Sequence, residues 1–179
     1  MDWSNVYLGA LKDHGIRVDP MKLRTVLGAG RRLMRVHYFS ATDENNPGQA
    51  RFEAMLQRHG FIVHTQPLEE RVRKVQCPDC GAKFDPVCPT CGRAVELPPH
   101  KSKMTDIDLA TRLLILADDY DEAVLVSGDK DFIPVIDWLR TVRNKRVVVF
   151  AWKKAFSGML VGKVDEVHRL DDHVSEIRE

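Results

Sequence analysis

The sequence predicts an α/β protein built on a parallel sheet. Two short apolar runs, residues 123–126 and 147–150, are continuous rather than alternating, which is typical of strands buried on both faces. Segments with apolar residues at helical spacing stand before, between and after these runs. Because parallel neighbours need a crossover connection, this alternation predicts a parallel sheet with right-handed crossovers.

Local signals place the elements along the chain. Asp19 and Pro20 are typical of an N-cap and the first position of a helix, and Gly15 and Gly60 are typical of helix ends. The expected helices cover residues 6–14, 20–27, 49–59, 106–117, 131–143 and 154–161. The expected strands cover residues 33–39, 61–63, 123–126, 147–150 and 167–170.

Composition and charge are those of an ordinary globular protein. Of the 179 residues, 44% are hydrophobic and 30% are charged, which argues against a largely disordered chain. The formal net charge of +1 excludes a basic coat of the histone type, but not a local basic groove. No apolar run approaches the roughly 18 residues that span a membrane, and the N-terminus has no signal-peptide pattern. We therefore expect a cytoplasmic protein without a membrane partner, with residues 1–179 forming one domain.

Four cysteines form two Cys-x-x-Cys pairs, each followed by a glycine. In such tight turns, backbone N–H groups point at thiolate sulfur, and four thiolates suit a closed tetrahedral zinc site. Two disulfides or a redox pair are the alternatives, but disulfides are disfavoured in a chain without a secretory signal. We expect a structural Zn²⁺ bound by Cys77, Cys80, Cys88 and Cys91.

The cysteines lie in a segment whose composition differs from that of the flanking chain. Arg71, Arg73 and Lys74 lead into it, and Pro98 and Pro99 close it. The segment has few large apolar residues, so it cannot build a core of its own. We expect residues 67–100 to be an inserted zinc ribbon whose order depends on the metal.

Acidic residues gather where the expected strands end or the next helices begin. They are Asp2, Asp106, Asp108, Asp129 and Asp131. In parallel sheets, functional groups collect at the carboxyl edge, and converging carboxylates repel one another unless a divalent cation neutralises them. Hard oxygen ligands that leave room for water favour Mg²⁺ or Mn²⁺.

These residues also have simpler interpretations. Asp131 fits a helix cap, and Asp106 and Asp108 fit a first helical turn, where the helix dipole favours acids. Lys101 and Lys103 are either solvated charges at the boundary of the insert or contacts to phosphate.

Three motifs together carry a resemblance to a known family. They are Asp2-Trp3-Ser4-Asn5-Val6-Tyr7 and the segments 103–110 and 125–134, the last of which contains Ser127-Gly128-Asp129-Lys130-Asp131. The chain resembles a NYN domain of the bacterial LabA-like group, within the PIN-like ribonuclease superfamily, over most of its length outside residues 67–100. The inserted ribbon departs from the minimal family pattern and suggests an added contact to nucleic acid or to a protein partner.

The resemblance implies a PIN-like, Rossmann-like doubly wound sheet and a metal-dependent ribonuclease acting on RNA. The implied Mg²⁺ or Mn²⁺ ligands are Asp2, Asp106, Asp129 and Asp131, with Asp108 as a further candidate, while Asn5 would orient substrate or the first carboxylate. Lys101, Lys103 and Ser127 are the expected substrate-binding residues. A non-catalytic nucleic-acid- or protein-binding regulatory module on the same fold is the alternative, and a toxin-type nuclease also stays open. The sequence does not indicate the oligomeric state.

The opening motif stands at the very start of this sequence. In a NYN-like domain this motif follows an apolar central strand, whereas here only Met1 precedes Asp2. We expect the first central strand to be truncated to a stub, with about five to eight further residues upstream. The alternative is a true start, with the gap closed by the neighbouring strands.

Overall fold

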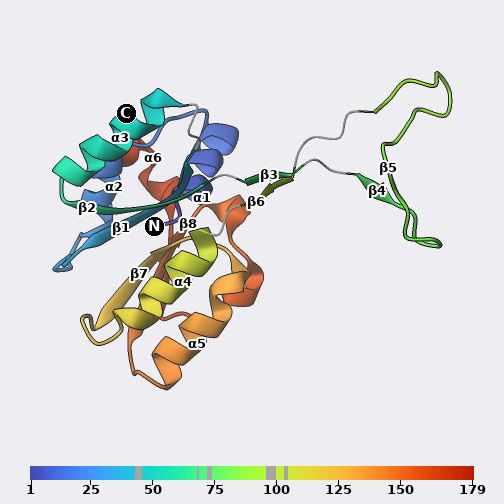
Figure 1. Cartoon of the computed structure of the whole chain (residues 1–179). Coiled ribbons are helices and arrows are strands. Elements are labelled where there is room, and N and C mark those ends of the chain that lie inside the picture. The colour runs from blue at the N-terminus through green and yellow to red at the C-terminus, as the bar shows by residue number, and fades with distance from the viewer. Residues whose placement is uncertain (43–45, 68, 72–73, 96–99, 103–104) are drawn as a thin grey trace.

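The computed structural model describes residues 1–42, 46–67, 69–71, 74–95, 100–102 and 105–179 (Figure 1). It confirms an α/β fold with parallel strands and helices. One parallel pair consists of β1 (Val36–Thr42) and β2 (Phe61–Pro67). A second parallel set consists of β7 (Glu122–Val126), β8 (Arg146–Ala151) and β9 (Glu166–Arg169), with β8 in the middle.

Met1 and Asp2 join the two sets of strands. Asp2 forms a parallel bridge with Phe39 of β1, and the Phe39 N–H donates to the Met1 carbonyl oxygen at 3.0 Å. On the other side, the Asp2 N–H donates to the carbonyl oxygen of Val126 in β7 at 3.1 Å. A stub of two residues therefore lies between β1 and β7.

Helices cover both faces of this sheet, which makes it doubly wound. Val148 and Phe150 of β8 point into one buried core, whereas Val147 and Val149 point into the other. The first core is closed by α1 (Trp3–Gly9), α2 (Pro20–Leu27), α3 (Pro47–Arg58) and α6 (Val174–Ile177), and the second by α4 (Thr105–Ile115) and α5 (Ile133–Thr141). Among the described residues, no helix has the length and apolar character needed to cross a membrane.

Several helix ends follow the signals read from the sequence. The Asp19 carboxylate accepts from the N–H groups of Met21 and Lys22, so α2 begins and ends where predicted. Gly60 follows α3 with φ +83°, a conformation that glycine adopts at low cost. The first helix instead begins earlier than predicted, at Trp3, because Asp2 caps it, and it continues as a π-helical turn over Ala10–His14.

Two expectations on secondary structure were wrong, and one helix was not predicted. The strand predicted over 33–39 begins three residues later and runs to Thr42, beside β2. The helix predicted over 154–161 is two short 3-10 turns, because the extended backbone of Ser157 separates them and its side chain caps the second. The short C-terminal helix α6 was not predicted, and Ile177 anchors it in the core.

The cysteine-containing segment projects from the α/β body (Figure 1). At its base, β3 (Glu69–Arg71) pairs antiparallel with β6 (His100–Ser102). Further out, β4 (Val75–Gln76) pairs antiparallel with β5 (Lys83–Phe84). The strands at the base thus extend beyond the predicted end of the insert at residue 100, and the insert as a separate unit stays a prediction.

Candidate functional site

The carboxyl edge of the sheet gathers the predicted acidic residues. β7 ends at Val126 and leads directly into the turn that carries Asp129, while Asp2 lies beside Val126. α4 ends a short turn before β7 begins, at the opposite edge. Since an 11-residue helix is about 16 Å long, the start of α4 with Asp106 lies at the carboxyl edge as well (Figure 1).

Asp2 is held at the junction of the stub and the first helix. Its side chain is only 5% exposed, and its carboxylate accepts from the Asn5 N–H at 3.2 Å, which caps α1. The Asn5 N–H therefore holds the Asp2 carboxylate in place, while the role expected for Asn5 in the active site stays a prediction.

The turn after β7 positions Asp129 and Asp131 differently. Asp129 is half-buried and its carboxylate accepts from the Asp131 N–H at 2.9 Å, so Asp129 is the cap that the sequence suggested at Asp131. Asp131 is exposed. Ser127 is buried, and its hydroxyl oxygen accepts from the Asp129 N–H at 3.4 Å, so it shapes this turn. Its contact with substrate stays a prediction.

The first turn of α4 supplies the remaining acidic side chains. Asp106 is half-buried, whereas Asp108 faces Arg112 one turn further on, with a shortest N–O distance of 3.4 Å. Lys101 belongs to β6 by its backbone, and Lys103 lies outside the described residues. Phosphate contacts by these two lysines therefore stay predictions.

The acidic side chains share one edge without forming a ready metal cluster. Within the described part of the chain, no three Asp, Glu, His or Cys side chains come together closely enough to hold one ion. The donor set at the edge consists of carboxylates, which fits Mg²⁺ or Mn²⁺ in its chemistry. Binding an ion at Asp2, Asp106 and Asp129 therefore requires these side chains to move toward one another.

Orphaned polar atoms mark the same edge. Three buried side-chain atoms of described residues lack a hydrogen-bond partner: Thr42 Oγ1, Thr105 Oγ1 and Arg169 Nη1. Thr42 ends β1, Thr105 begins α4 and Arg169 ends β9, so all three lie toward the carboxyl edge. Each such group costs about 1–3 kcal/mol when unpaired. The three atoms thus lie at the edge where parallel sheets commonly bind ligands.

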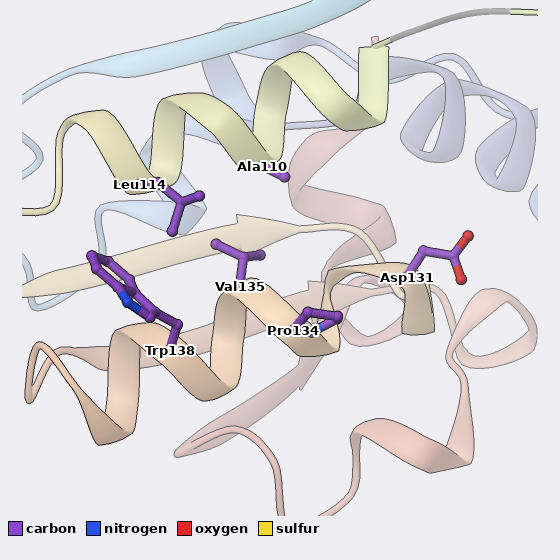
Figure 2. Close-up of a pocket in the computed structure, with 6 residues that line it drawn as sticks. All are labelled: Ala110, Leu114, Asp131, Pro134, Val135 and Trp138. Atoms are coloured by element: carbon purple, nitrogen blue, oxygen red, sulfur yellow. The ribbon is translucent and has the colours of Figure 1, made fainter.

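An apolar groove adjoins this edge between α4 and α5 (Figure 2). It has a volume of about 570 Å³, with Trp138 toward one end and Asp131 at the other. Its lining residues are Ala110, Leu114, Asp131, Pro134, Val135 and Trp138. The groove was not predicted from the sequence, although Leu114 and Trp138 add apolar surface beyond the face that each helix buries.

A histidine pair lies on the sheet beneath α4 and was also missed. His37 Nδ1 and His64 Nε2, on neighbouring strands, are 2.9 Å apart. Burial and the adjacent His64 lower the pKa of His37 to about 4, and burial lowers the pKa of His64. Both rings are therefore neutral at pH 7. In that form, one ring donates a hydrogen bond to the other.

The first cysteine pair forms a tight knuckle. The backbone N–H groups of Asp79 and Cys80 donate to the Cys77 sulfur and lower the pKa of that thiol. The Gly81 N–H donates to the Cys77 carbonyl oxygen at 2.9 Å, and Gly81 has φ +73°. The turn thus favours a thiolate, the form that binds zinc.

The second cysteine pair repeats this geometry. The N–H groups of Thr90 and Cys91 donate to the Cys88 sulfur and lower its pKa, and the Gly92 N–H donates to the Cys88 carbonyl oxygen at 2.8 Å. Both knuckles fit zinc in chemistry and local geometry. No three of the four sulfurs are gathered around one point, however, so the shared zinc site stays a prediction.

Comparison with known proteins agrees with this fold. The family profile described as NYN domain matches residues 1–171. The crystal structure of VPA0982, a protein of unknown function from Vibrio parahaemolyticus RIMD 2210633, superposes with a TM-score of 0.70 at 22% sequence identity. The alignment covers 99% of this chain and 92% of the other, and at this identity it shows the shared fold alone. The curated proteins gave no match.

Proposed function

We propose that this chain, which belongs to the NYN domain family, is a metal-dependent ribonuclease that cleaves RNA phosphodiester bonds. NYN domains are part of the PIN-like nuclease superfamily, and this membership supports nuclease chemistry and RNA as the substrate class. The observation that carries the proposal is the placement of Asp2, Asp106 and Asp129 at the carboxyl edge of a doubly wound sheet.

Asp2, Asp106 and Asp129 would hold the ion in this proposal, with Asp131 as a further ligand. Bound Mg²⁺ or Mn²⁺ supplies water activation and neutralises charge on the scissile phosphate. The Asn5 N–H donates to the Asp2 carboxylate and would fix its direction toward the ion. Asp108 is a weaker candidate, because Arg112 already faces it.

The projecting segment would add a second contact to RNA or to a protein partner. In this part of the proposal, Zn²⁺ bound by the two knuckles at Cys77, Cys80, Cys88 and Cys91 is structural, because four thiolates leave no open coordination position. Lys101 and Lys103, at the junction with α4, would contact the RNA backbone.

The decisive test is cleavage of a mixed-sequence RNA in Mg²⁺ or Mn²⁺ by the native chain and by Asp129→Asn. We expect the variant to lose at least about 100-fold in rate, because a metal ligand contributes several kcal/mol to charge stabilisation. Asp119→Asn makes the same chemical change at the opposite edge, before β7, and should keep full activity. Equal rates for both variants, or no cleavage by the native chain, would contradict the proposal.

A non-catalytic RNA- or protein-binding module is the second candidate function. The observation in its favour is that no three carboxylates converge within the described residues. Titration calorimetry with Mn²⁺ separates the two functions. A ribonuclease of this kind binds Mn²⁺ and loses that binding in Asp129→Asn, whereas a binding module retains RNA affinity without either property.

A further inference from the structure

Arg169 is half-buried, and one of its guanidinium nitrogens has no hydrogen-bond partner in the protein. It is the last residue of β9, and its Nη1 atom is buried with no hydrogen-bond partner. Two acidic side chains near it in the sequence are engaged elsewhere, since Glu166 pairs with Arg146 and Asp171 accepts from the Lys153 N–H. A buried donor without a partner costs free energy, and the half-buried guanidinium is still accessible to an anion from solvent.

An aromatic ring fixes the orientation of this guanidinium. Its central carbon lies 4.1 Å from the centroid of the Phe156 ring. Stacking on an aromatic face restrains the side chain and leaves the donors at the edge of the guanidinium plane directed away from the ring. Such a planar, pre-oriented set of donors suits the oxygens of a phosphate group.

Phe156 connects Arg169 to the acidic turn. A Cβ atom on Gly128 would lie only 2.8 Å from Phe156 Cα, so the two backbones are in direct contact. The Ser157 N–H donates to the Gly128 carbonyl oxygen at 2.9 Å. Gly128 immediately precedes Asp129, so the segment that supports Arg169 is fastened to the turn that carries a proposed metal ligand.

The separation from the acidic turn decides which phosphate Arg169 would reach. β8 lies between β7 and β9, and two strand spacings amount to about 10 Å. This backbone separation favours a phosphate next to the scissile one as the partner of Arg169.

We propose that Arg169, braced by Phe156, binds a phosphate of the RNA backbone adjacent to the cleavage site. The inference rests on the proposed function for its substrate class, but it concerns RNA binding rather than cleavage. It adds to the site a residue outside all three sequence motifs, on the far edge strand of the sheet.

The test measures the affinity of a fluorescent single-stranded RNA over a range of salt concentrations in Mg²⁺. Every protein carries Asp129→Asn to prevent cleavage, so the outcome does not depend on whether the native chain is a nuclease. We expect Arg169→Gln to weaken binding about tenfold and to reduce the slope of log affinity against log salt by about 0.7, the contribution of one phosphate contact. Arg58→Gln removes the same charge from the exposed end of α3 and should change neither quantity.

Arg169→Lys tests the planar geometry, because it keeps the charge and loses the stacked fork of donors. We expect this variant to bind RNA several-fold more weakly with an unchanged slope of log affinity against log salt. If Arg169→Gln fails to fold, the result for Arg169→Lys tests the inference. The inference is overturned if the Arg169 variants bind RNA as Arg58→Gln does while melting at a lower temperature, since Arg169 would then only hold the loop of Phe156. Absence of RNA binding by the Asp129→Asn background would overturn it equally.

Discussion

Replacement of Gly128 by alanine tests the close contact behind the acidic turn. The backbone of Gly128 lies so near residues 155 and 156 that an added methyl group would overlap the Ala155 carbonyl oxygen and lie 2.8 Å from Phe156 Cα. These neighbours are backbone atoms, which cannot rotate away as the end of a flexible side chain can. The hydrogen bond from the Ser157 N–H to the Gly128 carbonyl oxygen, 2.9 Å long, holds the two segments at this distance.

The cost follows from the size of the overlap. Ordinary contacts between carbon atoms lie at about 3.5–4.0 Å, so the loop must retreat by roughly 1 Å to admit the methyl group. Overpacking of this kind costs about 1–3 kcal/mol, and the retreat also lengthens the bond to Ser157. We therefore expect Gly128→Ala to lower the free energy of unfolding by about 2–3 kcal/mol.

Urea denaturation followed by tryptophan fluorescence measures this loss, and Gly158→Ala is the matched control. Gly158 lies in the same loop region, and nothing stands within 4 Å of its added Cβ atom. We expect the control to stay within about 0.5 kcal/mol of the native chain. If Gly128→Ala were as stable as Gly158→Ala, the close approach of the two segments would not be a constraint in solution, and the link from Phe156 to the acidic turn would fail with it.

Three further predictions concern other parts of the molecule. The folded state depresses the pKa of His37 to about 4 and lowers that of His64. The free energy of unfolding should therefore decline by about 1–2 kcal/mol, after allowance for solvent screening, as pH falls from about 6.5 toward 4. In denaturation curves measured across this range, His37→Gln should flatten the dependence. Cys80→Ser should abolish zinc binding, measured by metal analysis, while the thermal transition of the α/β body persists; loss of that whole transition would make the projecting segment integral to the core. Trp152→Phe should lower the free energy of unfolding by about 2 kcal/mol, because it removes the 2.9 Å hydrogen bond from the indole Nε1 to the Val6 carbonyl oxygen and leaves a gap in the core. Thermal denaturation measures the loss, and an unchanged melting temperature would contradict it.

Local chemistry explains which elements the sequence could predict. The bounds of α2 follow from Asp19 and Pro20 at one end and a glycine at the other, and these signals act within one turn. β8 was recognisable because a strand buried on both faces must be apolar throughout. The segment after β8 misled the prediction, because its apolar residues have helical spacing while Ser157 adopts an extended backbone that ends the first turn.

The candidate site was predictable in location but not in detail. Parallel topology sends the residues after β7 and at the start of α4 to one edge, so the gathering of Asp129 and Asp106 follows from chain order alone. Whether their carboxylates converge depends on side-chain distances, which no local pattern encodes. The sequence does not single out Arg169. Its proposed role depends on a nitrogen without a hydrogen-bond partner and on the ring of Phe156, 13 positions earlier, and neither can be read from a local pattern.

The two-residue stub between β1 and β7 is a seam that divides the sheet into two sets of strands. Within β1–β2 and within β7–β8–β9, ladders of several residues resist separation, whereas between them the Met1–Asp2 segment makes the strand contacts. At this seam the pairing between the two sets rests on fewer backbone hydrogen bonds than the pairing within each set. Asp2 lies on the seam and Asp129 follows β7 beyond it. A ligand that bridges the two carboxylates would therefore hold the two sets of strands together, and they would unfold more cooperatively when it is bound.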